Sequence, residues 1–261
     1  MASKPRDAVF TTALCKGNWA IADFQAHLDR LYLHAKRLRV KLPDDCHIKI
    51  AECLQERIEI SNFTENNTKL NLLTIKYCCQ ENKFNVSYRE LSEIRFSEIH
   101  GATVQLPKWF GEITGTKHGN WQPYLEAKQT VEELGADIAL LIDDFSIVDS
   151  DRANVLVIDE DGTAWVSNSS QAVNGITQQI IINKIQSLGI PVFEGRLNER
   201  MVARSEEIIV LGTGLGCCRI KTIDGEKIGR EDSIIFELAK DILSQHYSNP
   251  DTWTNMCEYL P

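Results

Sequence analysis

The stretch VLVIDEDGTAWVSNSSQAVNGIT, residues 155–177, contains the patterns of a strand, a tight turn, a second strand and the start of a helix. The opening VLVI is apolar and β-branched, and Asp161-Gly162 is a dipeptide typical of hairpin turns. Trp165-Val166-Ser167 resumes the strand pattern, and apolar residues at helical spacing begin after Gly175-Ile176. Strands and helices that alternate over so short a stretch predict an α/β fold.

The same alternation continues on both sides of this stretch. Short β-branched runs predict strands, and apolar residues three and four positions apart predict helices. In the C-terminal half, the expected strands are residues 138–142, 155–158, 165–167, 190–193 and 208–211, and the expected helices are residues 121–134, 176–188 and 233–246. In the N-terminal half, the expected strands are residues 8–14 and 70–79, and the expected helices are residues 22–39 and 46–59.

Residues 97–116 separate the two halves. They show no clean periodicity and contain Gly101, Pro107, Gly111 and Gly115, so we expect them to connect two domains. The prediction is a small N-terminal α/β domain over residues 1–115 and a larger C-terminal domain of short strands and helices over residues 116–261.

The composition is that of a globular chain. Of its 261 residues, 43% are hydrophobic and 25% are charged, which excludes a disordered or low-complexity protein. The net charge is −9 and the isoelectric point is about 5.2. This acidic balance argues against a general nucleic-acid binder and against a polybasic membrane-surface protein, so we expect neither partner.

The sequence shows no targeting signal, and its cysteine pattern is typical of the cytoplasm. No apolar run approaches the roughly 20 residues that span a bilayer, and residues 1–6 are followed by no signal-peptide core. The eight cysteines include no CxxC pair. We therefore expect reduced, buried thiols, no metal site and a cytoplasmic protein.

Two glycine-bearing segments are candidate phosphate sites. Residues 212–216, GTGLG, follow a strand, but Cys217 stands where the dinucleotide fingerprint needs its third glycine, so a nicotinamide enzyme is not expected. Asn174-Gly175-Ile176-Thr177 opens a helix, whose first N–H groups and positive dipole end favour an anion. By itself, either segment is more often a plain turn.

These segments belong to an ordered series of short blocks. The series consists of residues 7–12 (DAVFTT), 27–31 (HLDRL), 117–120 (KHGN), 149–155 (DSDRANV), 175–177 (GIT), 205–208 (SEEI), 212–213 (GT) and 223–225 (IDG). The order resembles the class IV aminotransferase family, the fold type IV pyridoxal-phosphate enzymes. That family includes branched-chain transaminases, D-amino acid transaminases and aminodeoxychorismate lyase. The resemblance implies two domains with the cofactor cleft between them, and a homodimer.

The resemblance also implies pyridoxal 5'-phosphate (PLP) as cofactor and gives six residues a role. The cofactor phosphate is assigned to Arg30, Ile176, Thr177 and Thr213, the Schiff base and the α-proton to Lys117, and the pyridine nitrogen to Asp149. The roles are chemically consistent, because a lysine amine attacks an aldehyde only when neutral, and burial beside a cationic ring lowers its pKa. A carboxylate against the ring nitrogen keeps the ring protonated, so that it can accept negative charge from the substrate.

Each assigned residue also has an ordinary structural interpretation. Lys117 could be a solvated surface charge, Arg30 the exposed face of a helix and Asp149 a turn residue. The chain also departs from the family, which normally has glutamate in place of Asp149 and arginine in place of Gln178. Residues 95–116, where ligands for the substrate carboxylate are expected, match no subfamily. Cofactor binding is therefore better predicted than substrate choice.

Three reactions remain open for a small-molecule substrate. The preferred hypothesis is a folate-pathway lyase that converts 4-amino-4-deoxychorismate to 4-aminobenzoate and pyruvate, because FTTA at residues 10–13, Lys117-His118 with Asn120, and VNGI at residues 173–176 look like bacterial members of that group. The alternative is a transaminase of branched-chain or D-amino acids. The third hypothesis is a family member without catalytic activity.

Overall fold

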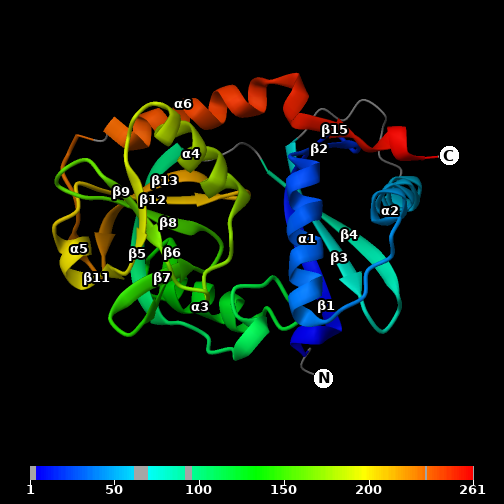
Figure 1. Ribbon diagram of the computed structural model, residues 1–261, viewed down its shortest axis with the longest axis horizontal. Coiled ribbons are helices and arrows are strands. Elements are labelled where there is room, and N and C mark those ends of the chain that lie inside the picture. The colour runs from blue at the N-terminus through cyan, green and yellow to red at the C-terminus, as the bar shows by residue number, and fades with distance from the viewer. Residues whose placement is uncertain (1–3, 62–69, 92–95, 233, 261) are drawn as a thin grey trace. The chain divides into compact units, whose positions relative to one another are not determined.

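The computed structural model describes residues 4–61, 70–91, 96–232 and 234–260. The chain divides into two compact units (Figure 1). The first unit comprises Met1–Glu93, Thr116–Trp121 and His246–Pro261, and the second comprises Ile94–Gly115 and Gln122–Gln245. Both units combine helices with a β-sheet, so the predicted α/β class is confirmed.

The first unit is built on an antiparallel sheet with the strand order β15-β2-β1-β3-β4. Its strands are β1 (Ala8–Lys16), β2 (Ala20–Ala22), β3 (Leu70–Cys78), β4 (Lys83–Glu90) and β15 (Trp253–Asn255). The helix α1 (Phe24–Leu38) packs against β1, and α2 (Cys46–Ser61) packs against β4 (Figure 1). Three short 3-10 helices complete the unit: η1 (Pro5–Asp7), η3 (Pro250–Thr252) and η4 (Met256–Tyr259).

The packed face of α1 matches the predicted helical spacing. Its apolar residues Phe24, Leu28, Leu31, Ala35 and Leu38 are all buried. Burial of this stripe removes apolar surface from water at about 25 cal/mol per Å², which holds the helix on the sheet. Three polar residues of the same helix, His27, Arg30 and His34, are buried as well.

The second unit is built on a larger sheet with the order β10-β9-β8-β12-β13-β5-β6-β7-β11, and β14 pairs with β13. Its strands are β5 (Phe96–Gln105), β6 (Ile138–Asp143), β7 (Ser146–Ser150), β8 (Asn154–Ile158), β9 (Ala164–Ser167), β10 (Val192–Gly195), β11 (Leu197–Asn198), β12 (Glu207–Gly212), β13 (Gly216–Ile223) and β14 (Glu226–Lys227). Its helices are η2 (Gly111–Ile113), α3 (Gln122–Glu133), α4 (Ile176–Ser187), α5 (Glu199–Ala203) and α6 (Ile234–Ser248), whose last turn belongs to the first unit.

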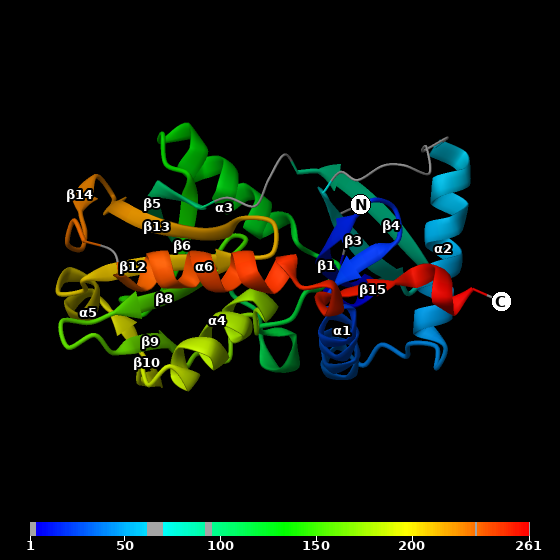
Figure 2. The same ribbon diagram turned by 90° about the horizontal axis from the view of Figure 1, so that it is seen from above.

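The larger sheet curves back on itself. The strand β7, near one end of the order, contacts β8 and β9 near the other end. The curvature encloses a core that includes Leu140, Val157 and Val210. The helix α4 packs against β12, and α6 lies along β12 and β13 (Figure 2). Because the strands are covered on both faces, all residues of β7, β8 and β12 are buried.

The compact units divide at different residues from the predicted boundary at 115/116. Residues 97–116 were expected to connect two domains, but β5 lies inside the larger sheet, parallel to both β13 and β6. Residues 116–121 belong with the first unit because Val9 forms a bridge with His118. The C-terminal residues 246–261 also join the first unit, because β15 pairs with β2.

Most other predicted elements lie within two residues of their observed positions. The expected helix over 233–246 corresponds to α6, but its first residue, Ser233, lies outside the described residues. All eight cysteines fall within the described ranges and are free, although four of them are not buried. Among the described residues, no group of three or more His, Cys, Asp or Glu residues could hold a metal ion. None of the helices built from described residues is long and apolar enough to cross a membrane.

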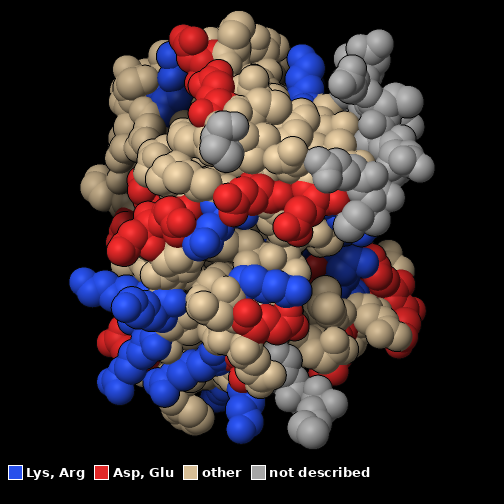
Figure 3. Space-filling model, turned by 90° about the vertical axis from the view of Figure 1, so that its right-hand side faces the viewer, with Lys and Arg blue, Asp and Glu red and all other residues tan. Residues whose placement is uncertain are grey.

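The charges on the surface of the first unit are unevenly distributed. On the face seen in Figure 3, Asp and Glu side chains form a band, while Lys and Arg side chains gather mainly below it. Acidic and basic groups therefore both contribute to this face, although the chain as a whole has a net charge of −9.

Candidate functional site

Arg30 is a buried residue on the inner side of α1, with 8% of its surface exposed. Its Nη2 atom donates a hydrogen bond to Thr11 Oγ1 on β1 at 2.9 Å, and Thr11 Oγ1 also lies 2.8 Å from His27 Nδ1. Burial lowers the Arg30 pKa to about 10, so the guanidinium remains a cation at neutral pH. Arg30 is thus a buried positive charge, and its interpretation as the exposed face of a helix is wrong.

Lys117 lies on the extended segment that runs beside β1. Its carbonyl accepts a hydrogen bond from the Phe10 N–H at 3.2 Å, and its own N–H donates to His34 Nδ1 at 3.1 Å. The Nζ atom is 4.6 Å from the ring centroid of Trp121 and 5.2 Å from that of Phe10. These distances are in the range of cation–π contacts, so the side chain has a defined direction.

The positive charges of Lys117 and Arg30 lower the pKa of the same two histidines of α1, His27 and His34. Burial, together with the positive charges of Arg30 and Lys117, lowers the pKa of His27 well below its usual value and that of His34 to about 3. Both imidazoles are therefore neutral at physiological pH. The first unit thus brings the expected phosphate ligand and the expected reactive amine together around neutral histidines.

Asp149 is held at the end of β7, with 4% of its surface exposed. Its Oδ1 atom accepts hydrogen bonds from the Ser150 N–H and from Asn154 Nδ2, both at 3.0 Å. Its Oδ2 atom accepts one from the Val173 N–H at 2.9 Å. Buried carboxylates need such donors, and these three fix the orientation of the side chain. The interpretation of Asp149 as a solvated turn residue is therefore wrong.

Tyr124 on α3 is a buried neighbour of Asp149. Burial and the negative charge of Asp149 raise the pKa of Tyr124 to about 12, although a hydrogen bond with Trp109 acts in the opposite direction. The phenol therefore keeps its proton at neutral pH and leaves Asp149 as the negative group of this pair.

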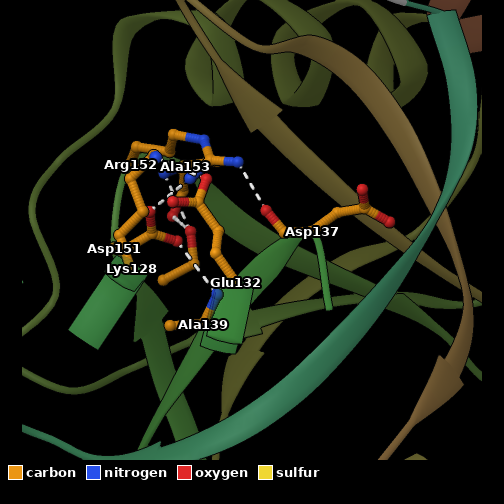
Figure 4. Close-up of polar contacts among 8 residues, drawn as sticks. Lys128, Glu132, Asp137, Ala139, Asp151, Arg152 and Ala153 are labelled. Atoms are coloured by element: carbon orange, nitrogen blue, oxygen red, sulfur yellow. Dashed lines mark hydrogen bonds and ion pairs between the residues drawn. The ribbon is translucent and has the colours of Figure 1, made fainter. Parts of the chain in front are cut away.

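Asp151 and Arg152 follow Asp149 closely in the chain, but they belong to a separate set of hydrogen bonds that does not include Asp149 (Figure 4). Asp151 Oδ1 accepts a hydrogen bond from the Ala139 N–H at 3.0 Å, and Oδ2 pairs with Arg152 Nη1 at 2.6 Å. Arg152 Nη2 donates to the Asp137 carbonyl at 2.5 Å. These contacts tie the bulky Arg152 side chain to the segment before β6, and they occupy both carboxylate oxygens of Asp151.

The N-terminus of α4 lies close to Asp149 and to the end of β12. Gly175 is its N-cap residue, and no side chain caps the helix among the described residues. The first amides, including those of Ile176 and Thr177, can therefore donate to an anion at this end of the helix. Thr177 Oγ1 lies 3.4 Å from Thr213 Oγ1, which follows β12. The second unit thus gathers Asp149, Ile176, Thr177 and Thr213, whereas Arg30 and Lys117 belong to the first unit.

Close packing between Gly175 and Asn154 connects the helix to the carboxylate. A Cβ atom on Gly175 would lie 1.7 Å from Asn154 Oδ1, so only glycine fits here. The Asn154 amide also donates to the Val173 carbonyl at 2.6 Å. Asn154 therefore sets the positions of both Asp149 and the residues that precede α4.

Sequence reasoning missed several residues of the site. His27 and His34 lie three residues before and four residues after Arg30, so the helical period places all three on one face of α1, and this spacing could have been noticed. Phe10 lies in a recognised block and Trp121 directly follows another, but neither carries a signal of a contact with Lys117. The support that Asn154 gives to Asp149 depends on the turn between β7 and β8 and is not visible in composition.

Known proteins resemble this chain in sequence and in fold. Residues 8–223 match the sequence profile of the amino-transferase class IV family. A probable branched-chain-amino-acid aminotransferase of Rickettsia typhi is 24% identical, with 88% of this chain and 82% of the relative covered.

Two solved structures share the fold. A branched-chain aminotransferase from Thermoproteus uzoniensis matches with a TM-score of 0.79 and 14% identity, covering 96% of this chain and 90% of that one. A putative 4-amino-4-deoxychorismate lyase from Legionella pneumophila matches with a TM-score of 0.73 and 16% identity, covering 92% and 91%. At these identities the structures establish the fold alone.

Proposed function

The chain belongs to the class IV aminotransferase family, whose members are PLP enzymes, and we propose that it is a PLP-dependent transaminase of branched-chain or D-amino acids. The sequence relative supports transamination over the lyase that short motifs favoured, because it is named as an aminotransferase. The proposed cofactor ligands are Arg30, Lys117, Asp149, Ile176, Thr177 and Thr213.

The donor set fits the cofactor chemically. A phosphate dianion needs fixed cations and N–H or O–H donors, which Arg30, the uncapped start of α4 and the Thr177–Thr213 hydroxyl pair supply. A protonated ring nitrogen needs a buried carboxylate, and Asp149 is one whose two oxygens are oriented by backbone and amide donors. An aldehyde needs an amine, and Lys117 has a half-buried one.

When bound, PLP supplies an aldehyde for covalent attachment and a ring that accepts the electron pair released at the substrate α-carbon. Lys117 is the residue that would attach, and its Nζ, once released and neutral, would move the proton from the substrate α-carbon to the former aldehyde carbon, which is the transfer that transamination needs. The Trp121 and Phe10 rings limit the directions in which Nζ can move. Asp149 would hold a proton on the ring nitrogen, and Arg30 would anchor the phosphate.

The observation that carries the cofactor proposal is the convergence of Arg30 and Lys117 on the same two histidines of α1. The Lys117 N–H donates to one of these histidines, His34, and Arg30 Nη2 lies 3.5 Å from Nδ1 of the other, His27. The cationic phosphate ligand and the reactive amine thus belong to one unit, so the packing of that unit fixes their separation.

The first experiment tests covalent attachment. The purified chain mixed with PLP should develop an absorbance band that borohydride abolishes, and mass spectrometry should then locate the reduced adduct at Lys117. Lys117→Ala should remove the adduct, whereas Lys108→Ala, which changes an exposed lysine of the second unit, should not. An adduct at one specific site that persisted in Lys117→Ala would show that another lysine is the reactive one.

The second experiment separates the transaminase from the lyase. L- and D-amino acids should be consumed only when a 2-oxo acid acceptor is present, because the amino group must be passed on. The lyase is the second candidate, supported by the short matches FTTA and VNGI. Pyruvate release from 4-amino-4-deoxychorismate without an acceptor would favour the lyase and contradict the transaminase.

We also propose that the chain forms a homodimer, as its family relationship implies. Analytical ultracentrifugation at micromolar concentration should give a mass close to twice the chain mass of 29.5 kDa. A single species with the mass of one chain would contradict this proposal.

A further inference from the structure

The buried histidine His34 makes a contact that the proposed function does not use. It lies on α1 four residues after Arg30, and 1% of its surface is exposed. Residues four apart on a helix project from the same face. One face of α1 therefore carries both the proposed phosphate ligand and His34.

His34 is a hydrogen-bond acceptor toward the backbone of Lys117. The Lys117 N–H donates to His34 Nδ1 at 3.1 Å. An imidazole nitrogen that accepts carries no proton, so the neutral ring must carry its proton on Nε2. Burial and the neighbouring cations Arg30, Lys117 and Arg37 lower the pKa of His34 to about 3, so this nitrogen remains an acceptor at neutral pH.

The peptide at Lys117 is therefore held from two sides. The Lys117 carbonyl accepts a hydrogen bond from the Phe10 N–H on β1, and the Lys117 N–H donates a hydrogen bond to His34 Nδ1 on α1. The neighbouring His118 bridges to Val9, which extends the attachment to β1. With the backbone fixed, the cation–π contacts with Trp121 and Phe10 need only to direct the side chain.

We propose that His34 is a positioning residue for Lys117, which connects the helix that carries Arg30 to the backbone that carries the reactive amine. The inference rests on the proposed function of Lys117. Phosphate and aldehyde are separated by a rigid ring, so the amine and the guanidinium must keep a matching separation. Through His34, α1 sets this separation, although His34 itself is not one of the proposed cofactor ligands.

A direct test uses the unaltered chain. In the ¹⁵N-labelled apoprotein, NMR should detect a through-hydrogen-bond coupling between the Lys117 amide nitrogen and His34 Nδ1. The Lys117 amide should also exchange slowly with deuterium. Absence of the coupling together with rapid exchange would overturn the proposal, and neither measurement depends on cofactor or on a substitution.

Variants test the consequence for the amine. In His34→Phe, which keeps a ring but removes the acceptor, the Lys117 amide should exchange at least tenfold faster, and the rate constant for PLP attachment should fall about tenfold. Inhibition of attachment by inorganic phosphate should be unchanged, because Arg30 remains. His34→Asn keeps an acceptor and should restore both rates. His47→Phe, on α2, should behave like the unaltered chain.

The outcomes separate the inference from the proposed function. If the unaltered chain attaches no PLP at Lys117, the proposed function fails and the inference fails with it. If it attaches PLP and His34→Phe does so at the same rate, with the same amide exchange, the inference alone is wrong. Slow attachment in His34→Asn, with the rate of the unaltered chain in His34→Phe, would show that His34 acts only by filling space.

Discussion

Asn154 Nδ2 donates a hydrogen bond to Asp149 Oδ1 at 3.0 Å, five residues earlier in the chain. The same amide group donates to the Val173 carbonyl, and the Val173 N–H donates to the other oxygen of Asp149. The carboxylate, the start of β8 and the segment before α4 thus form one closed set of hydrogen bonds. A substitution of any one member is therefore expected to displace the hydrogen-bond partners of the others.

Asp149→Asn should reduce both turnover and stability. Loss of an ionic contact to the ring nitrogen is expected to cost about 3 kcal/mol, or roughly a hundredfold in rate. In addition, the new amide NH₂ must face either the Val173 N–H or the Asn154 amide, and an unsatisfied buried donor costs about 1–3 kcal/mol. Single-turnover kinetics and thermal unfolding measure the two effects.

Asp151→Asn is the matched control for this substitution. It removes a buried carboxylate two residues away that contacts Ala139 and Arg152, so stability should fall while turnover is retained. If Asp149→Asn behaved in the same way as Asp151→Asn, Asp149 would have only a structural role.

Asp149→Glu tests whether the site is adapted to the shorter side chain. Both oxygens of Asp149 already have fixed donors, so one additional methylene group must displace the Asn154 or Val173 contacts. Overpacking of this kind costs about 1–3 kcal/mol, and activity should decrease. Increased turnover in Asp149→Glu would indicate instead that the site has lost an ancestral glutamate and functions below its capacity.

Gly175→Ala should disorganise the same set of hydrogen bonds from the helix side. The added Cβ would lie 1.7 Å from Asn154 Oδ1, so the amide must leave its position. We expect PLP affinity to fall by at least tenfold and the thermal unfolding midpoint to drop by several degrees. Gly111→Ala is the control, because its Cβ meets no atom within 4 Å and only its positive φ of 58° opposes the change. Unchanged PLP affinity in Gly175→Ala would count against the proposed ligands on α4.

Arg30→Lys should weaken PLP binding although it conserves the charge. Lysine lacks the planar fork that can donate to Thr11 and to a phosphate at the same time. The expected loss is about 1.5–3 kcal/mol, or ten- to a hundredfold in the dissociation constant, measured by equilibrium dialysis of PLP. Arg57→Lys, on the exposed side of α2, should bind PLP as the unaltered chain does. Equal affinities in both variants would remove Arg30 from the proposed phosphate ligands.

The elements that could be predicted from sequence are those with a strong local pattern. The helix α1 was predicted because its apolar residues follow the helical period, and the strands β8 and β12 because each contains a continuous run of apolar, mostly β-branched residues. The strand β5 was missed, since it contains Gly101 and lacks alternation. The structure supplies the reason for the glycine: a Cβ there would lie 3.1 Å from Leu140 Cδ1, in a strand enclosed by β13 and β6.

The candidate site also contains residues that could be predicted from sequence and contacts that could not. Arg30, Lys117 and Asp149 stand in short blocks whose order can be recognised in one sequence. The contact between His34 and Lys117 joins residues 83 positions apart, and only the tertiary structure brings them together. Strand β15 was missed for a related reason, because a short edge strand takes its structure from the distant β2.

The buried histidines predict a specific loss of stability in acid. The pKa of His34 is lowered to about 3 and that of His118 to about 4, mainly by burial, whereas both titrate near 6.5 in an unfolded chain. Between pH 6.5 and 4 the unfolded chain therefore binds protons that the folded chain does not. The free energy of unfolding should fall with falling pH by about 1.4 kcal/mol per pH unit for each histidine, and this loss should level off below the folded pKa values.

His34→Asn isolates one of these contributions. Asparagine can accept the Lys117 N–H but does not titrate, so the variant should lose less stability than the unaltered chain as the pH falls from 6 to 5, by about 1.4 kcal/mol. Urea unfolding followed by circular dichroism at pH 7, 6 and 5 measures the difference. Parallel curves for His34→Asn and the unaltered chain would mean that His34 takes up a proton in the folded state, which its hydrogen bond to Lys117 forbids.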